Sequence, residues 1–403
     1  MKEKSYLHNP GALKIDLMLR GTRVEDPVMK AWACGTSGID ILLPRETLVN
    51  IPCDEAFTGR SPYVVKKGPG GYTITDGTDE VPVTLVERPA FYGKKTTTGV
   101  KFSEIAAAHG SYTVITPSPR CDFFNAKIEC RYCAGNFDLN DRGKDRAYTV
   151  DEVLETVEAV LKERASEIIY LSMGFSEGDD GGIEFLKPYI KEIKKHFHCL
   201  VAVEALPPKR NHWIDETYAV GADSVLYNLE IFDPELFKVI CPGRAELVGR
   251  KRYLDSLEYA AKVFPNGTVA SHLIVGLEPP GSTIQGIDFL TSRGVVPILP
   301  IYRPSRGRAL RIEPLNAEII IPVYKHLYRA LTKEKINFKW VRDISMVTTP
   351  VEGRLLLEGE KLDRSLLDAF YRSRIGLKTA WGLSTLRRKL RVKEVKEDPH
   401  KKK

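Results

Sequence analysis

Short apolar runs alternate with amphipathic segments from residue 111 to about residue 304, and this alternation constrains the fold more than any other feature of the chain. Runs of roughly four to eight apolar residues suit strands buried on both faces, and helices of about a dozen residues fit between them. The pattern predicts an α/β fold, a partial (β/α)6 barrel of the TIM type. The six expected strands cover residues 111–119, 167–174, 199–208, 224–232, 268–277 and 295–304.

The regions on either side of the barrel have a different character. The first hundred residues are rich in glycine and threonine, and 61–77 (SPYVVKKGPGGYTITDG) predicts two strands around a GPGG turn. We therefore expect a β-rich N-terminal domain over 1–104 and a barrel over 105–330. The rest, 331–403, is expected to form a helical C-terminal extension that covers the barrel and ends in a basic tail.

Composition excludes several classes of protein. With 43% hydrophobic and 28% charged residues in a chain of 403, the sequence predicts a folded globular protein. No apolar run reaches the roughly 18 residues of a membrane span, and no apolar segment follows the charged start. An odd count of seven cysteines also argues against a secreted disulfide framework. We expect a cytoplasmic protein with no membrane partner.

The net charge of +7 comes from 60 Lys and Arg against 53 Asp and Glu. Much of the excess lies in residues 387–403, so the body of the protein is close to neutral. A terminal basic run of this kind is expected to be solvated and frayed, and nucleic acid is not an expected partner.

Three cysteines follow the first expected strand in the segment CDFFNAKIECRYC. Cys121, Cys130 and Cys133 form a Cys-x8-Cys-x2-Cys pattern, one thiolate fewer than a closed zinc site or a fully ligated cluster needs. A [4Fe–4S] cluster held by three thiolates leaves one iron open for a substrate or cofactor. Loops after barrel strands carry the chemistry of such folds, so we predict a catalytic cluster here. The alternative is a zinc-binding or structural iron–sulfur loop.

This loop resembles that of the radical S-adenosylmethionine (SAM) superfamily, whose members carry three cysteines after the first strand of a partial (β/α)6 barrel. Tyr132 stands at the aromatic position that precedes the last cysteine in that family. The first gap of eight residues departs from the usual three, although longer gaps occur in several branches. The order of the ICPG, HLIVGL and RP segments is similar to the biotin synthase-like branch.

Strand alternation supplies further candidates. In LVAVEALPP it places Glu204 on the face opposite Val201 and Val203, toward the barrel interior. We predict that Glu204 is one of the residues that bind the SAM cofactor, and an ion pair with a cation at the barrel mouth is the alternative role for Glu204. In SVLYNLEIF the same rule places Asn228 and Glu230 together on one face.

The resemblance implies roles for these and other residues. It implies that Asn228 and Glu230 hold the SAM ribose, that Arg250 or Arg252 meets the SAM carboxylate, and that Gly174, with Ser176 nearby, gives backbone contacts to SAM. His272, Tyr302, Arg303 and Arg306 are expected near the mouth, where the arginines hint at an anionic substrate. The other cysteines, Cys34, Cys53, Cys199 and Cys241, are expected to be buried small side chains, with an auxiliary cluster as the alternative.

Family membership implies an activity. A [4Fe–4S] cluster and SAM would be the cofactors, and reductive cleavage of SAM would give a 5′-deoxyadenosyl radical that abstracts hydrogen from a small-molecule substrate. Flavodoxin or ferredoxin is the expected electron donor. The alternative function is a non-catalytic iron–sulfur or zinc-binding scaffold or maturation protein.

Overall fold

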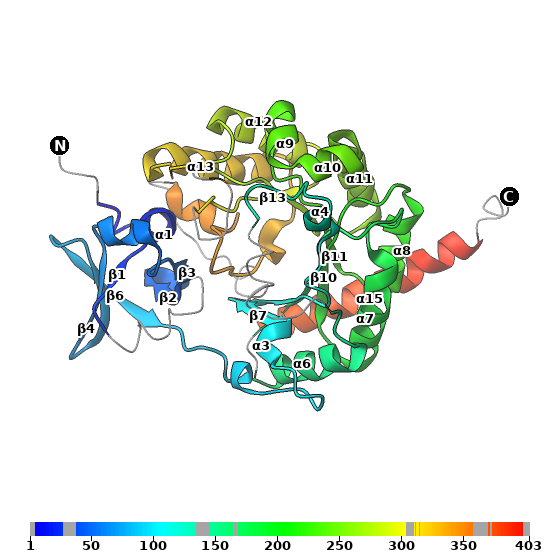
Figure 1. The fold of residues 1–403 in the computed structure, drawn as a ribbon, viewed down its shortest axis with the longest axis horizontal. Coiled ribbons are helices and arrows are strands. Elements are labelled where there is room, and N and C mark those ends of the chain that lie inside the picture. The colour runs from blue at the N-terminus through cyan, green and yellow to red at the C-terminus, as the bar shows by residue number, and fades with distance from the viewer. Residues whose placement is uncertain are drawn as a thin grey trace.

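The structure, a computed structural model, consists of two sheets and the helices around them (Figure 1). It describes residues 5–26, 38–133, 146–163, 166, 168–303, 310, 312–313, 315–357, 370 and 373–397.

A six-stranded sheet forms the N-terminal unit, with strand order β1-β4-β5-β6-β2-β3. The predicted GPGG hairpin is confirmed: β4 and β5 pair antiparallel, and Gly71 at its turn has a φ of 115°. The strands are β1 (Arg23–Val24), β2 (Ile39–Leu43), β3 (Thr47–Ile51), β4 (Val64–Gly68), β5 (Gly71–Thr75) and β6 (Glu80–Leu85).

Helix α1 (Pro10–Arg20) packs on this sheet and was not predicted. Asn9 caps it by accepting from the Ala12 N–H at 3.0 Å, and proline occupies its first position. Its polar side chains Lys14 and Asp16 are buried, because Lys14 pairs with Glu352 at 2.9 Å and Asp16 accepts from the Tyr63 hydroxyl at 2.6 Å. A helix buried on all sides lacks the polar face that marks an amphipathic helix in a sequence.

The second sheet is the barrel, with strand order β13-β12-β11-β10-β9-β8-β7. Strands β8 to β13 are parallel and confirm the six predicted strands, while β7 is an additional edge strand antiparallel to β8. The strands are β7 (Ala106–His109), β8 (Tyr112–Ile115), β9 (Ile168–Ser172), β10 (Leu200–Glu204), β11 (Ser224–Leu226), β12 (Val269–His272) and β13 (Val296–Ile298).

Helices cover the outer face of the curled sheet (Figure 1). Val201 and Val203 of β10 are fully buried in the outer core, whereas Ala202 packs inside the barrel with Ile168 and Leu226. The alternation that the sequence predicted for this strand is therefore confirmed. The helices of the barrel region are α3 (Phe102–Ile105), α4 (Asp122–Asn125), α6 (Val150–Glu163), α7 (Ile183–His196), α8 (His212–Val220), α9 (Pro234–Ile240), α10 (Pro242–Leu247), α11 (Arg250–Val263) and α12 (Pro280–Thr291).

A segment from the C-terminal region lies between the two edges of the barrel sheet. The Arg342 N–H donates to the Tyr112 hydroxyl at 3.2 Å, and the Ser111 N–H donates to the Asp343 carbonyl at 2.9 Å. On the other side Val347 forms an isolated bridge with Pro300. The C-terminal extension thus covers the side of the barrel, as predicted. The described ranges also hold five short 3-10 helices: η1 (Pro44–Glu46), η2 (Ala56–Arg60), η3 (Ala90–Gly93), η4 (Phe338–Trp340) and η5 (Glu352–Leu356).

Two longer helices belong to the C-terminal part. Helix α13 (Ala317–Lys333) packs on α12 and α1, and α15 (Arg374–Glu397) runs past the amino ends of the barrel strands. Arg388 of α15 donates to Asp223 at 2.7 Å, and Arg391 donates to the Val263 carbonyl at 2.7 Å. The expectation that this basic run is solvated is wrong for these two arginines, because the barrel offers them acceptors.

One continuous hydrophobic core links the N-terminal sheet, the barrel and α13. Arg303 donates to the Asn50 side chain at 3.2 Å and to the Asn50 carbonyl at 3.0 Å, which joins the barrel to β3. Arg303 therefore joins the two sheets, and its presence no longer supports the prediction of an anionic substrate. None of the helices in the described ranges has the length and apolarity needed to cross a membrane.

Candidate functional site: the cysteine loop at the carboxyl end of the barrel

The first half of the cysteine loop is docked on the loop that follows β9. The Phe175 N–H donates to the Cys121 Sγ at 3.3 Å, and the Asp122 N–H donates to the Phe175 carbonyl at 2.8 Å. The Phe123 and Phe175 rings stack with their centroids 4.2 Å apart. These contacts fix Cys121 at the carboxyl end of β9.

Gly174 permits this close approach. A Cβ at residue 174 would lie 2.5 Å from the Cβ of Cys121 and 2.6 Å from the Arg120 carbonyl oxygen, distances that no side chain tolerates. Gly174 therefore lies against the cysteine loop, and the role in SAM contact that the resemblance implied stays a prediction. Ser176 is exposed two residues further on.

The second half of the loop is docked on α9 and α10. The Arg131 N–H donates to the Ile240 carbonyl at 2.9 Å, and the Gly243 N–H donates to the Ile128 carbonyl at 2.9 Å. Cys130 is buried there beside Cys241, which sits between the two helices. The eight-residue gap thus lets Cys121 lie against the loop after β9 while Cys130 lies at the junction of α9 and α10.

Two neighbouring residues favour the thiolate of Cys130. The adjacent Cys241 thiol lowers the pKa of Cys130 most, and burial opposes this effect. The charge of Arg244 and its Nε–H, which donates to the Cys130 Sγ at 3.3 Å, lower the pKa of Cys130 further. Burial instead raises the pKa of Cys121, against the effect of the backbone donors Phe175 and Phe123. A buried cysteine that favours its thiolate suits a metal ligand, since only the thiolate binds metal.

Arg244 is the central cation of the site, and the sequence analysis missed it. Besides Cys130, it donates to the Asn228 carbonyl at 2.5 Å and to the Tyr253 hydroxyl at 3.2 Å, and it lies 3.5 Å from a Glu230 carboxylate oxygen. The spacing could have revealed it, because residues three apart share a helix face and Arg244 follows Cys241 by three.

The two arginines that the resemblance suggested brace neighbouring loops. Arg250 donates to the Phe232 carbonyl at 3.0 and 2.7 Å and lies over the Phe232 ring. Arg252 donates to the Pro208 carbonyl at 2.6 Å and to Asn211 at 2.9 Å. Within the described part of the chain, the buried Nη2 of Arg252 has no hydrogen-bond partner, so Arg252 keeps a donor for a ligand.

The half-buried Glu204 and the buried Asn228 form a hydrogen-bonded pair inside the barrel. The Asn228 amide donates to Glu204 at 2.5 Å, and the Ser172 hydroxyl donates to the other Glu204 oxygen at 2.7 Å. The backbone N–H of His272 in turn donates to the Asn228 Oδ1 at 3.0 Å. Glu204 faces inward, as alternation predicted, and Ser172 and Asn228 hold its carboxylate in place of the cation considered as an alternative.

Glu230 lies in strained backbone. Its φ of 71° is unusual for a residue with a side chain, and backbone hydrogen bonds to His272 and Ile274, each 2.8 Å, hold it there. Strand β11 ends at Leu226, so the alternation expected as far as residue 232 is wrong. Glu230 reaches the side of Asn228 because of this left-handed turn, and Arg244 contacts both residues.

Tyr132 extends the same cluster. Its hydroxyl is buried near Arg244, Cys130 and Glu230, and among the described residues it has no hydrogen-bond partner. Cys133 follows, with its N–H donating to the Cys130 carbonyl at 2.9 Å. An orphaned buried hydroxyl beside a cysteine is available to a bound group.

The donor set fits an iron–sulfur cluster. Over the described ranges, no three His, Cys, Asp or Glu side chains surround one point as the ligands of a single metal ion would. A cubane makes a different demand, since each thiolate binds a different iron. N–H donors to Cys121 and Cys130 suit such a cluster, whose sulfurs commonly accept hydrogen bonds.

Apart from Cys241, the other expected residues fall outside this cluster, and Cys53 is half-buried, so the expectation that it is buried is wrong. Tyr302 donates to the Leu310 carbonyl at 2.5 Å, and Cys199 is buried at the start of β10. Cys241 is buried as expected, but it touches Cys130. Cys34 and Arg306 lie outside the described residues.

The barrel belongs to a known family. Residues 115–285 match the family model of the radical SAM superfamily, and this part of the chain is a radical SAM domain. Members of that superfamily use a [4Fe–4S] cluster and SAM, which agrees with the cysteine loop. The biotin synthase-like branch and the residues assigned by resemblance stay predictions.

Similar proteins cover only parts of the chain. The bacteriochlorophyllide c C-7(1)-hydroxylase of Chlorobaculum limnaeum is 29% identical over 132 residues, which is 32% of either chain. The crystal structure of methylornithine synthase (PylB) is 14% identical with a TM-score of 0.46, over 68% of this chain and 85% of that one. The crystal structure of HydG, a maturase of the [FeFe]-hydrogenase, is 15% identical with a TM-score of 0.44, over 57% of this chain and 51% of that one.

Proposed function

We propose that this protein is a radical SAM enzyme of the biotin synthase-like branch that abstracts hydrogen from a small-molecule substrate. The observation that carries the proposal is the docking of the cysteine loop, through Gly174 and Arg244, onto a buried polar cluster at the carboxyl end of the barrel. In α/β barrels this end carries the chemistry.

Cys121, Cys130 and Cys133 would hold the [4Fe–4S] cluster, and Asn228, Glu230, Arg252 and the Gly174 loop would hold SAM. Bound there, the cluster would supply the electron that cleaves SAM to methionine and the 5′-deoxyadenosyl radical. The carboxylate of Glu230 is an acceptor for ribose hydroxyls or an amino group, and the unpaired Nη2 of Arg252 is a donor for a carboxylate.

The remaining residues position these groups. Arg244 connects Cys130 to the Asn228 carbonyl and to Glu230, so that the cysteine loop and the SAM-binding residues keep a fixed separation. Ser172 and His272 orient Glu204 and Asn228. The half-buried ring of Tyr132, whose hydroxyl is fully buried, would limit the access of water beside Cys130, which protects a reactive intermediate from side reactions.

The proposal extends to partners and organisation. Flavodoxin or ferredoxin would supply the electron, in the cytoplasm, and the substrate would be a small molecule. The units would be 1–104, 105–330 and 331–403. The hydroxylase relative acts, by its name, on a bacteriochlorophyllide, which makes hydroxylation of an unreactive carbon one candidate reaction.

Anaerobic reconstitution tests the function against the scaffold alternative. We expect about four irons per chain, an absorption shoulder that dithionite bleaches, and an electron paramagnetic resonance signal that changes when SAM is added. A signal that is insensitive to SAM, or tightly bound zinc without iron, would favour a scaffold.

A further inference from the structure

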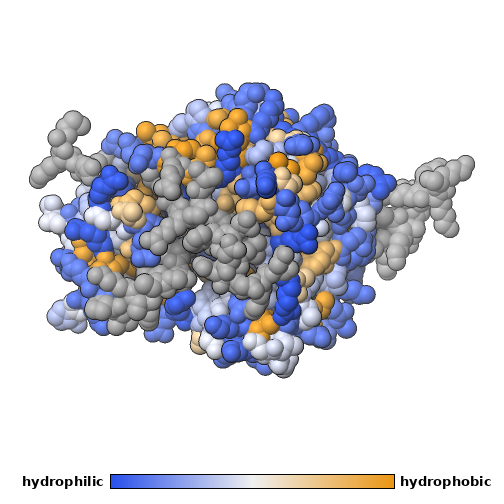
Figure 2. All heavy atoms as spheres, viewed as in Figure 1, coloured by the Kyte–Doolittle hydropathy of each residue, from blue (hydrophilic) through white to orange (hydrophobic). Residues whose placement is uncertain are grey.

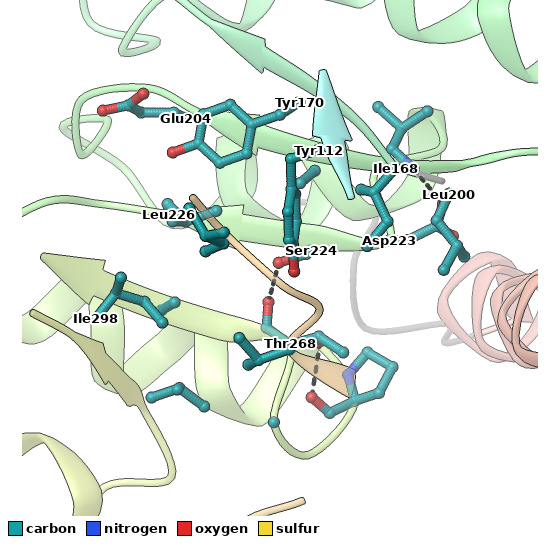
Figure 3. A pocket seen from close by; sticks show the side chains of 18 of the residues that line it. Tyr112, Ile168, Tyr170, Leu200, Glu204, Asp223, Ser224, Leu226, Thr268 and Ile298 are labelled. Atoms are coloured by element: carbon teal, nitrogen blue, oxygen red, sulfur yellow. Dashed lines mark hydrogen bonds between the residues drawn. The ribbon is translucent and has the colours of Figure 1, made fainter. Parts of the chain in front are cut away.

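A cavity of about 540 Å³ runs through the interior of the barrel. One end lies at Glu204 and His272, and the other lies beside Leu383 and Arg387 of α15. Figure 3 shows Glu204 and Asp223 at opposite ends of the labelled lining residues, with Tyr112, Tyr170 and Leu226 between them. The size is typical of cavities that bind small molecules.

Small inward side chains create this space. A barrel interior is normally filled by layers of large branched residues. Here Ala202, Ser224 and Ala270 occupy inward positions on three adjacent strands, β10, β11 and β12, and all three line the cavity. The chain thus leaves the interior open where a packed core would be expected.

The wall between the two ends is mostly apolar, and two of its hydroxyl groups are already bonded to backbone carbonyls. The Ser224 hydroxyl donates to the Thr268 carbonyl at 2.6 Å, and the Thr268 hydroxyl donates to the Pro265 carbonyl at 2.8 Å. Aliphatic walls come from Val114, Ile168, Leu200, Leu226, Val296 and Ile298. A cavity of this kind favours an apolar guest over water.

The polar end of the cavity leads directly to the cysteine loop. Glu204 bonds Asn228, whose carbonyl accepts from Arg244, and Arg244 donates to Cys130. A guest in the cavity therefore has one end beside the residues proposed to hold SAM. Its other end extends toward α15, along strands of about five residues or about 13 Å.

The geometry points to a substrate with an elongated apolar portion, which fills the barrel interior and presents the reacting carbon beside Glu204 and Asn228. The binding of such a substrate is inferred from the cavity alone, whereas its reaction at the polar end rests on the proposed function. Burial of the apolar portion would hold the substrate in register, so that the length of the portion sets which carbon reaches the polar end.

Binding of 1-decanol tests the inference without any reaction. Equilibrium dialysis of labelled 1-decanol against the full-length, cluster-loaded protein should show saturable binding of one molecule per chain. Across a series from 1-butanol to 1-decanol, each added methylene should tighten binding roughly two- to fourfold. Ala270→Leu, which places a larger side chain in the middle of the cavity, should weaken decanol binding at least about tenfold.

Two further variants keep the test falsifiable. Ala202→Val adds a smaller side chain to the cavity and replaces Ala270→Leu as the test variant if the circular dichroism spectrum of Ala270→Leu shows that it does not fold. Ala219→Leu makes the matched change on the exposed face of α8, and it should bind decanol as the parent protein does. Absence of saturable binding, or equal affinity in the filled variants, would overturn the inference. Release of 5′-deoxyadenosine without substrate tests the proposed function separately. Failure of the proposed function is therefore distinguishable from failure of the inference about the cavity.

Discussion

The two ends of the barrel both bury charged residues, but they use them differently. At the amino end, Asp223 accepts from Lys194 at 2.8 Å, Arg388 at 2.7 Å, Ser384 at 2.6 Å and the Val201 N–H at 2.9 Å. At the carboxyl end, Arg244 and Glu230 are 3.5 Å apart, and Arg244 also donates to a cysteine sulfur. At the amino end the Asp223 carboxylate is fully hydrogen-bonded, whereas at the carboxyl end the charged Arg244 contacts the cysteine loop.

The difference separates structural charges from functional ones. The Asp223 network fastens α15 to the barrel and needs no ligand. At the carboxyl end Glu230 has strained backbone, and the Tyr132 hydroxyl and the Arg252 Nη2 are buried without partners among the described residues. Within the same ranges the Nε of Arg388 also lacks a partner at the amino end, so unpaired groups alone do not separate the two ends. The strain at Glu230 and the N–H donors to the cysteine sulfurs set the carboxyl end apart. Substitutions at the carboxyl end should therefore change cofactor binding, and those at the amino end should change stability.

The largest effect is expected from the cysteines. Replacing Cys121, Cys130 or Cys133 by alanine should remove essentially all iron from the reconstituted protein, because a cubane held by two thiolates is not retained. Iron and sulfide analysis after anaerobic desalting measures this. Cys53→Ala in the N-terminal unit is the control and should keep its iron, and a Cys130→Ala protein with full iron would contradict the assignment.

At the amino end of the barrel, Asp223→Asn should lower the free energy of unfolding by about 3–5 kcal/mol, because it leaves Lys194 and Arg388 buried without their counter-charge. Urea denaturation measures this loss. The exposed pair Lys251–Asp255 offers a control, since Asp255→Asn should cost less than about 1 kcal/mol. Iron content should be unchanged in both variants, and loss of iron in Asp223→Asn would break the distinction between the two ends.

Glu230→Gln should weaken SAM binding by about 1.5–3 kcal/mol while the cluster stays intact, because a charge-assisted hydrogen bond becomes a neutral one. Isothermal titration of the cluster-loaded protein with SAM gives the affinity. The matched change at the exposed Glu235 of α9 should have no effect. Unchanged affinity in Glu230→Gln would remove Glu230 from the SAM site.

A smaller effect concerns pH. Burial alone would raise the pKa of Asp223, but Lys194 and Arg388 outweigh it and the pKa of Asp223 is lowered. Its contribution to stability is therefore present above the unfolded pKa of about 3.9 and is lost as the pH falls below it. Between about pH 5 and pH 2, unfolding free energy should fall more steeply in the parent than in Asp223→Asn, and parallel curves would contradict the shift.

The sequence predicted the barrel well because its signals are local. Apolar runs such as LVAVE repeat within a few residues, and three cysteines on one loop need no knowledge of the rest of the chain. Arg244 was missed because its partners Cys130, Asn228 and Tyr253 come from three segments. Glu230 was placed in a strand because alternation cannot reveal a positive φ, and the cavity arises only where small residues from three strands meet.

Cleavage of SAM by the reduced protein tests the central claim most directly. Cluster-replete protein, reduced by dithionite or flavodoxin, should convert SAM slowly to 5′-deoxyadenosine and methionine even without substrate, and Cys130→Ala should not. Chromatography of the quenched mixture over hours measures both products. If the parent yields no more 5′-deoxyadenosine than Cys130→Ala, the carboxyl end of the barrel is not a radical SAM active site.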